Sequence, residues 1–337
     1  MLPDQPWYVV VPAPEAMPSG GNRYNAALLQ ALTQAGVAVV RAKPDEVPAV
    51  ARVCWVDTLY LDVWTHRPGT LNLLIVHHLE SLDPPAGHSP ADWFERHERS
   101  RLEAYDGFLV SSPFTAQYLR QGGLTQPILT VLPALCVARG HSQPPAGPPI
   151  VLMVANLIAR KGILPLLEAL AGAATLPPFQ LEIAGTGDIE PDYAAAVRRL
   201  IETTPALRTR VRLLGALSRE DVRAAYGRAS LFVSTARMET FGMALQEAVA
   251  FGLPVLAVAG GHAGTHVQPG ENGFLFPDAG ALARGLLSLL TDPEQLRTLR
   301  RRAEACDPYR DYGWPEAVAG LLTQMQAAFG PEQIPRL

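Results

Sequence analysis

The stretch Leu231-Phe-Val-Ser-Thr-Ala-Arg-Met-Glu-Thr-Phe-Gly-Met-Ala-Leu-Gln-Glu247 joins a strand, a short loop and a helix. Leu231–Ser234 is an apolar run of the kind that forms a strand covered on both faces. Met243–Phe251 has the composition of a helix, and Gly242 before it lets the backbone approach a ligand closely. A strand that passes through a glycine loop into a helix is the repeating unit of parallel α/β folds.

The same alternation extends along the chain in two sets. The later set has strands expected at Ile150–Val154, Gln180–Ala184, Val211–Leu214, Leu231–Ser234, Val255–Val258 and Gly273–Phe276, and helices at Ile163–Ala171, Tyr193–Glu202, Arg219–Tyr226 and Ala281–Arg302. The earlier set has strands at Trp7–Val11, Val37–Val40, Val53–Val56, Leu71–Val76, Gly107–Val110 and Ile128–Leu132, and helices at Tyr24–Ala35 and Asp92–Ala104. A proline-rich loop is expected after the first strand.

The segment His141–Pro149 separates the two sets. It reads HSQPPAGPP, which continues neither a helix nor a central strand, so we predict a linker there. The chain is therefore predicted to be an α/β protein with two Rossmann-like, doubly wound parallel-sheet domains, at 1–145 and 146–310, that face a cleft. In open sheets of this kind ligands bind at the carboxyl ends of the strands.

Composition excludes several classes of protein. The chain has 337 residues, of which 48% are hydrophobic, so two domains can each bury a core. The net charge of −4 argues against a general nucleic-acid binder. Three widely spaced cysteines suggest neither a zinc site nor a disulfide framework. With no signal peptide and no run of about 18 apolar residues, the expected location is cytoplasmic.

Two carboxylates flank the start of the helix at Met243. The N–H groups of Gly242, Met243 and Ala244 form an anion site of the kind that a diphosphate occupies. Glu239 lies in the loop and Glu247 about one turn into the helix, and ionised carboxylates suit the vicinal hydroxyls of a ribose or a hexose. A structural role for both, as a helix cap, an arginine partner or a solvated loop residue, is equally compatible with the local sequence.

A basic turn lies between a strand and a helix at Ala155-Asn-Leu-Ile-Ala-Arg-Lys-Gly162. Arg160 and Lys161 place two cations at the carboxyl end of a strand, where they can neutralise a departing phosphate. An Arg-Lys pair more commonly lies in a solvent-exposed turn that has no binding role. The chain contains only two lysines, Lys43 and Lys161, and this scarcity favours a functional role for Lys161.

These motifs together resemble the signature of the retaining glycosyltransferases of family 4, which have the GT-B fold (glycosyl transferases group 1). The similarity covers roughly residues 150 to 280. It consists of the Glu239 and Glu247 pair with Phe241-Gly242, the Arg-Lys-Gly turn, Gly185-Thr-Gly187, Val211-Arg-Leu-Leu-Gly215, Gly252-Leu-Pro-Val255, Gly260-Gly261 and Gly270-Glu-Asn-Gly-Phe-Leu-Phe276.

The resemblance implies a role for each of these positions. Glu239 would hold the sugar hydroxyls and Glu247 the ribose, while Arg160 and Lys161 would stabilise the leaving diphosphate. The remaining donor-binding positions would be Asn156, Gly185, Gly187, Phe241, Gly242, Met243 and Ala244. Asn156 stands where the family often has an arginine, and Arg160 is expected to supply the missing charge.

The first half of the chain resembles the family less closely. Ser19-Gly-Gly-Asn-Arg-Tyr24 is similar to the glycine loop that approaches the donor diphosphate, here through Gly20 and Gly21. Leu74-Ile-Val-His-His78 resembles the strand end that presents a histidine to the donor sugar, with His77 favoured over His78. From sequence alone, a lone histidine is more often structural. The helix at about 315–330 resembles the family's terminal helix, which packs back on the first domain.

The implied activity is a retaining, metal-independent transfer of a hexose from a GDP- or UDP-sugar to an acceptor hydroxyl of a glycan, lipid or small molecule. No Asp-x-Asp pair is present, and no cofactor or metal is expected. Synthesis of a glycolipid, polysaccharide or other glycoconjugate would bring transient contact with the inner membrane face.

Three other functions are weighed against this one. A phosphorylase-like enzyme needs a lysine for pyridoxal phosphate, and only Lys43 remains for it. A nicotinamide dehydrogenase needs a third glycine that Gly185-Thr-Gly187 lacks. A sugar-nucleotide-binding protein without turnover is supported by Asn156 alone.

Overall fold

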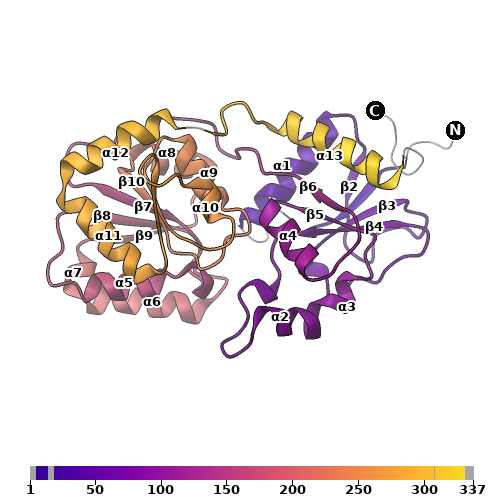
Figure 1. The fold of residues 1–337 in the computed structure, drawn as a ribbon, viewed down its shortest axis with the longest axis horizontal. Helices are drawn as coiled ribbons and strands as arrows, with labels where there is room; N and C mark the ends of the chain where they lie inside the picture. The colour runs from indigo at the N-terminus through magenta and orange to yellow at the C-terminus, as the bar shows by residue number, and fades with distance from the viewer. Residues whose placement is uncertain (1–4, 14–18, 307, 331–337) are drawn as a thin grey trace. The chain divides into compact units, whose positions relative to one another are not determined.

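The computed structural model describes residues 5–13, 19–306 and 308–330. The chain divides into two compact units. Unit 1 extends to Cys136 and resumes at Tyr312, and unit 2 comprises Val137–Asp311. Each unit is built on one six-stranded parallel sheet (Figure 1).

The sheet of unit 1 has the strand order β2-β1-β3-β4-β5-β6. Its strands are β1 (Trp7–Val10), β2 (Val39–Arg41), β3 (Val53–Asp57), β4 (Leu71–Val76), β5 (Gly107–Val110) and β6 (Ile128–Thr130). Its helical segments are α1 (Gly20–Gln34), η1 (Thr58–Tyr60), η2 (Glu80–Leu82), α2 (Pro90–Trp93), a π-helical turn η3 (Phe94–Glu98), α3 (Arg99–Leu102), α4 (Pro113–Gln121) and α13 (Trp314–Phe329). Every residue of β3 and β4 is buried, because both faces of a parallel sheet are covered.

Helix α13 belongs to unit 1 although it follows unit 2 in the chain. Its first residue, Trp314, packs against Tyr24 of α1 with ring centroids 5.7 Å apart. Gln324 exchanges two hydrogen bonds with the backbone of Thr130 at 2.9 and 3.1 Å. Helix α13 thus packs against α1 and is hydrogen-bonded to β6.

The sheet of unit 2 has the strand order β12-β11-β10-β7-β8-β9. Its strands are β7 (Ile150–Val154), β8 (Gln180–Ala184), β9 (Val211–Gly215), β10 (Leu231–Ser234), β11 (Val255–Val258) and β12 (Gly273–Phe276). Its helical segments are η4 (Ala159–Lys161), α5 (Ile163–Ala171), α6 (Pro191–Thr203), α7 (Pro205–Arg208), α8 (Arg219–Arg228), α9 (Met243–Ala250), α10 (Ala263–His266), α11 (Ala279–Thr291) and α12 (Pro293–Ala305).

Two apolar layers cover the two faces of this second sheet. Along β10, Leu231 and Val233 join the layer built with α5, α6, α11 and α12, whereas Phe232 joins the layer built with α8, α9 and α10. This alternation follows from the two-residue period of a strand. It explains why strands with two covered faces read as uninterrupted apolar runs rather than as alternating patterns.

The predicted α/β class and the two parallel sheets are confirmed, and several boundaries differ. Helix α1 begins at Gly20 rather than Tyr24, because the Ser19 side chain accepts a hydrogen bond from the Asn22 N–H at 3.1 Å and caps it. Gly20 and Gly21 therefore lie in its first turn and not in a loop. The single helix expected at 281–302 is divided into α11 and α12 by Asp292 and Pro293. Part of the expected proline-rich loop, residues 14–18, lies outside the described residues.

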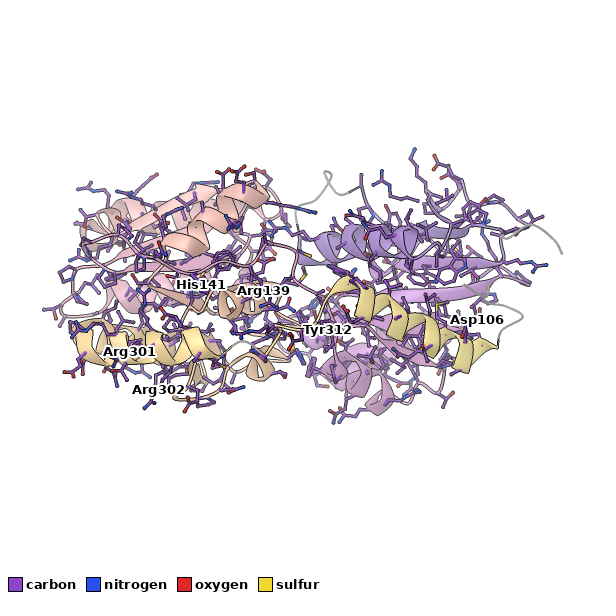
Figure 2. The ribbon with its side chains drawn as sticks, turned by 90° about the horizontal axis from the view of Figure 1, so that it is seen from above. Asp106, Arg139, His141, Arg301, Arg302 and Tyr312 are labelled. Atoms are coloured by element: carbon purple, nitrogen blue, oxygen red, sulfur yellow. The ribbon has the colours of Figure 1, made fainter. Side chains whose placement is uncertain are left out.

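The proline-rich segment 141–149 is part of unit 2 rather than a linker. The N–H groups of Ser142 and Gln143 donate to the carbonyls of Phe251 at 3.2 Å and Gly227 at 2.7 Å. Arg139 and His141, labelled in Figure 2, lie in the same stretch of unit 2. Prolines interrupt helices and strands, but a proline-rich segment can still pack against a domain. The composition of 141–149 therefore predicts where the α/β pattern is interrupted, and it does not predict where the two units divide.

Candidate functional site

The two strongest sequence motifs lie at the centre of the sheet of unit 2. Strands β7 and β10 are neighbours, and the strand order runs in opposite directions from them, with β8 on one side and β11 on the other. This is a topological switch point, where loops diverge from the carboxyl ends of the strands and leave room for a ligand. The loop after β7 carries Lys161, and the loop after β10 carries Glu239.

Lys161 and Glu239 form an ion pair at this point. The Lys161 Nζ lies 2.5 Å from the Glu239 Oε1, and the two side chains are 17% and 14% exposed. Burial raises the pKa of Glu239, but the positive charges of Lys161 and Arg160 outweigh it and leave this pKa below its usual value. Burial lowers the pKa of Lys161, and the nearby carboxylate opposes that change. The pair thus concentrates two opposite charges in a nearly closed site.

The basic turn is fastened to the loop after β10. Gly162 has φ of +65°, and a Cβ atom there would lie 2.4 Å from the Thr235 carbonyl oxygen. The Thr235 hydroxyl donates to the Lys161 carbonyl at 2.7 Å, and the Arg237 N–H donates to the Arg160 carbonyl at 3.2 Å. Only glycine permits this close approach, which places Lys161 beside Glu239.

Helix α9 presents its amino terminus at the same edge of the sheet. Its N-cap is Gly242, which has φ of +94° and no side chain that could accept from the first N–H groups. The Leu245 and Gln246 N–H groups donate to the Gly242 carbonyl, so Met243 and Ala244 are the positions whose N–H groups precede the helical ladder. These groups and the helix dipole favour an anion.

Two buried histidines hold Phe241, the residue before the N-cap of this helix. Phe241 stacks on His262, with ring centroids 5.4 Å apart, and meets the edge of His266 at 4.9 Å. The His266 Nε2 lies 2.6 Å from the Phe241 carbonyl oxygen. Burial lowers the pKa of His266 to about 4, so the imidazole is neutral at physiological pH. The sequence motifs did not single out either histidine.

Glu247 lies deeper than the sequence suggested. It is 1% exposed, and its Oε2 lies 3.0 Å from the hydroxyl of Tyr226 on α8. The same hydroxyl lies 3.1 Å from the Ala244 carbonyl oxygen. Tyr226, which sequence reasoning missed, thus connects the carboxylate to the first turn of α9.

The glycine loop after β8 is packed against the loop after β7. A Cβ atom on Gly185 would lie 2.0 Å from the Ala155 carbonyl oxygen, and one on Gly187 would lie 2.7 Å from an Arg198 nitrogen. The Asn156 Oδ1 accepts a hydrogen bond from the Thr186 N–H at 3.1 Å. Close contact within the protein already requires Gly185, and Asn156 links the two loops.

A second group of polar side chains lies in unit 1, at the carboxyl ends of β3 and β4. The His77 Nε2 lies 2.8 Å from the Asn25 Oδ1 and 3.4 Å from the Asp57 Oδ2. The Asn25 amide donates to the same Asp57 oxygen at 2.7 Å. A Cβ atom on Gly21 would lie 3.0 Å from the His77 ring, so this glycine makes room for the imidazole.

This unit 1 group orients His77. Burial lowers the pKa of His77, and the buried carboxylate of Asp57 opposes that change. Asn25 and Asp57 were missed by sequence reasoning. The available signal was the position of Asp57, a carboxylate that ends an otherwise apolar strand.

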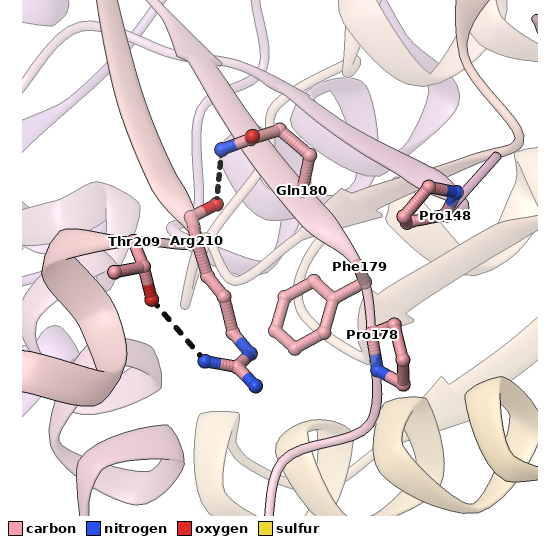
Figure 3. Close-up of a pocket in the computed structure, with 6 residues that line it drawn as sticks. All are labelled: Pro148, Pro178, Phe179, Gln180, Thr209 and Arg210. Carbon is pink, nitrogen blue, oxygen red and sulfur yellow. Dashed lines mark hydrogen bonds between the residues drawn. The ribbon is translucent and has the colours of Figure 1, made fainter.

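A surface hollow of about 360 Å³ lies elsewhere on unit 2, at the amino end of β8 (Figure 3). It is lined by Pro148, Pro178, Phe179, Gln180, Thr209 and Arg210. The Arg210 guanidinium donates to the carbonyls of Leu176, Pro177 and Ala206, and Gln180 donates to the Arg210 carbonyl. These polar groups bind the protein itself, so the hollow offers a ligand little recognition.

The expectations from sequence concern both a membrane and a metal. Among the described residues, no helix is both long and apolar enough to cross a membrane. Within the same ranges, no three His, Cys, Asp or Glu side chains cluster in a way that would hold a metal ion.

Comparison with known proteins agrees with the motifs. The family model "Glycosyl transferases group 1" matches residues 138–305. A D-inositol 3-phosphate glycosyltransferase of Catenulispora acidiphila is 39% identical over 105 residues, which span 31% of this chain and 25% of that relative. The chain therefore covers only about a quarter of that protein.

Solved structures share the fold over nearly the whole chain. A sucrose-phosphate synthase from Thermosynechococcus elongatus gives a TM-score of 0.72 at 23% identity, and covers 96% of this chain and 100% of its own. HepE from Anabaena, solved with UDP and glucose, gives a TM-score of 0.71 at 17% identity, over 94% and 99% of the two chains. Together these comparisons confirm the resemblance to the group 1 glycosyltransferases and the predicted GT-B fold.

Proposed function

Since the chain belongs to the group 1 glycosyltransferases through residues 138–305, we propose that it transfers a sugar from a nucleoside diphosphate donor to an acceptor hydroxyl with retention, as in family 4. The observation that carries this proposal is the ion pair of Lys161 and Glu239 at the switch point of unit 2. The N-cap of α9, Gly242, lies three residues beyond Glu239 in the same loop.

In this proposal the diphosphate of the donor binds the cations and the helix terminus. Its negative charge grows as the bond between the sugar C1 and the phosphate oxygen breaks. Lys161, Arg160 and the N–H groups of Met243 and Ala244 stabilise that charge, and they are fixed before the reaction begins. These groups take the place of a divalent cation, so the enzyme works without a metal.

Glu239 then takes up the sugar. In the structure its carboxylate accepts a hydrogen bond from Lys161. When the donor enters, Lys161 turns to the phosphate, and Glu239 accepts hydrogen bonds from sugar hydroxyls. The acceptor oxygen bonds to C1 on the face that the diphosphate leaves, and its proton passes to the departing phosphate oxygen. No covalent sugar–enzyme intermediate is needed for this route.

The other positions complete the donor site. Glu247, oriented by Tyr226, accepts from the ribose hydroxyls once a small movement of the loop admits the nucleoside. Gly185 and Gly187 let the loop after β8 pack closely against the rest of unit 2 beside the donor site. The structures that share the fold include one bound to UDP and glucose, which supports a uridine diphosphate sugar as the donor; a guanosine diphosphate sugar is the alternative.

Unit 1 is assigned the remaining contacts. Asn25 and Asp57 hold His77 in unit 1, and we assign His77 to the contact with the donor sugar and Gly20 and Gly21 to its diphosphate. A glycolipid or polysaccharide acceptor, with transient contact at the inner membrane face of the cytoplasm, is our proposal for the substrate class.

A thermal-shift screen against GDP-mannose, UDP-glucose and UDP-GlcNAc tests the donor, and release of the nucleoside diphosphate tests turnover. We expect one donor to raise the melting temperature and to be consumed when an acceptor is present. A donor that binds without ever being consumed would instead support a sugar-nucleotide-binding protein. If no donor binds, the proposed function is wrong.

A further inference from the structure

The peptide between Phe241 and Gly242 has an orientation that its own backbone does not enforce. Gly242 has φ of +94° and begins α9. Glycine populates both halves of the φ range, so this peptide could rotate to its opposite orientation at little cost. A trans peptide points its C=O and N–H in opposite directions. The direction of the Phe241 carbonyl therefore sets the direction of the Gly242 N–H.

His266 fixes that carbonyl. Its Nε2 lies 2.6 Å from the Phe241 oxygen, and since a carbonyl only accepts, the proton must be on Nε2. The neutral ring then leaves Nδ1 as an acceptor, and the hydroxyl of Tyr309 donates to it. Tyr309 thus selects the tautomer that holds the Phe241–Gly242 peptide.

The backbone of this small network is itself anchored. The side-chain amide of Asn272 donates to the His266 carbonyl at 2.9 Å, and Asn272 is fully buried. The Arg139 guanidinium donates to the Tyr309 carbonyl. His262 and Glu239 are the titratable groups that act on His266 beside Tyr309. His266 and Tyr309 are therefore both held by residues outside the loop that precedes α9.

We propose that His266 and Tyr309 are positioning residues for the donor diphosphate. They hold the Gly242 N–H in the direction in which it can join the N–H groups of Met243 and Ala244. This inference rests on the proposed function, because it assigns the peptide to the same anion site. Tyr309 lies three residues before the chain enters unit 1 at Tyr312, so the segment that connects the units also sets the donor loop.

The test compares donor-analogue binding in the full-length protein and in substituted forms. UDP and GDP are titrated by calorimetry against wild type, Tyr309→Phe, His266→Gln and His266→Leu. Loss of one hydrogen bond in the network predicts a dissociation constant about three- to tenfold higher for Tyr309→Phe. His266→Gln retains an N–H near the position of Nε2 and should bind several-fold more tightly than His266→Leu. A purely packing role for His266 predicts that leucine is at least as good as glutamine.

Tyr312→Phe is the matched control, since it removes a hydroxyl that donates to Leu132 within unit 1 at 3.0 Å. We expect its affinity to equal that of wild type. Nitrogen-15 NMR of labelled histidine supplies a second readout. The signal lost in His266→Gln should show the Nε2–H tautomer in wild type and a raised pKa in Tyr309→Phe, because the donor to Nδ1 is gone.

The outcomes separate this inference from the proposed function. If wild type binds neither diphosphate, the proposed function fails. If wild type binds and Tyr309→Phe binds equally well with an unchanged His266 tautomer, the positioning role is refuted and the proposed function stands. A weaker Tyr309→Phe variant with glutamine better than leucine at position 266 supports the inference.

Discussion

Replacement of Lys161 by methionine tests the centre of the candidate site. Methionine retains the apolar stem of lysine and removes the ammonium group that lies 2.5 Å from the Glu239 carboxylate. Lys43 is the only other lysine in the chain, and its side chain is 76% exposed. Lys43→Met is therefore a control with the same chemical change at a position outside the site.

The expected effect on rate follows from the developing charge on the diphosphate. One fixed donor directed at such a charge contributes a factor of about 10² to 10³ in kcat. We expect Lys161→Met to lower kcat for donor turnover by about that factor, and Lys43→Met to leave it unchanged. Arg160 and the amino terminus of α9 remain, so the residual rate should still exceed the uncatalysed one.

The expected effect on stability follows from the carboxylate left behind. Breaking a fully buried ion pair costs about 3 to 5 kcal/mol. Because Glu239 is 14% exposed and Arg160 still favours its charged form, we expect Lys161→Met to lower the free energy of unfolding by about 2 kcal/mol.

The pH dependence of that loss gives a further check. In wild type the pKa of Glu239 is lowered, so its stabilisation is present above the ordinary carboxyl pKa and is lost as pH falls through the lowered value. Burial raises this pKa once Lys161 is gone. The difference in unfolding free energy between the two proteins should therefore shrink as the pH falls from 7 into the acid range.

Urea unfolding monitored by circular dichroism measures the stability, and release of nucleoside diphosphate measures the rate. A Lys161→Met protein that turns over donor at the wild-type rate would refute the role of this ion pair. Equal losses in Lys161→Met and Lys43→Met would show that the effect is unrelated to the site.

Three other predictions concern the site and its reaction. Glu239→Gln should abolish transfer while circular dichroism shows an intact fold, and a wild-type rate would remove Glu239 from the site. Gly162→Ala should cost about 2 kcal/mol or more in urea unfolding, because φ is +65° and the new Cβ meets the Thr235 carbonyl; an unchanged midpoint would contradict that contact. Activity should be unchanged in excess EDTA, and a loss that Mg²⁺ restores would show that the proposed metal-free reaction is wrong.

The chain order of strands and loops made part of the site predictable. Strands with two covered faces, such as Leu231–Ser234, are uninterrupted apolar runs and were located within a residue or two. Polar residues in the loops that follow such strands gather at one edge of a parallel sheet. That rule predicts Lys161 and Glu239 at the same edge.

Capping residues in the sequence explain two differences between the predicted and the observed helices. Helix α4 was not predicted, although Ser112 followed by Pro113 is a typical N-cap and first helical residue. The same pair of roles at Asp292 and Pro293 divides α11 from α12. In both places proline starts a helix rather than ending one.

The contacts missed in the site depend on residues far apart in the chain. The hydroxyl of Tyr309 meets His266 across 43 positions, and Asn25 meets Asp57 across 32. Periodicity and spacing within a window of about 15 residues carry no information on such pairs. Glu247 shows the same limit, because its burial against Tyr226 depends on how α8 packs beside α9.

The return of α13 to unit 1 has a consequence for how the chain is made. Residues 5–136 lack their last helix until residues 314–329 have left the ribosome, and all of unit 2 is synthesised in between. At typical elongation rates that interval is about 10 to 35 s. During it the faces of Tyr24 and β6 that α13 covers have no partner from their own unit. The contiguous unit 2 can complete its sheet first, and unit 1 closes only after α13 has been synthesised.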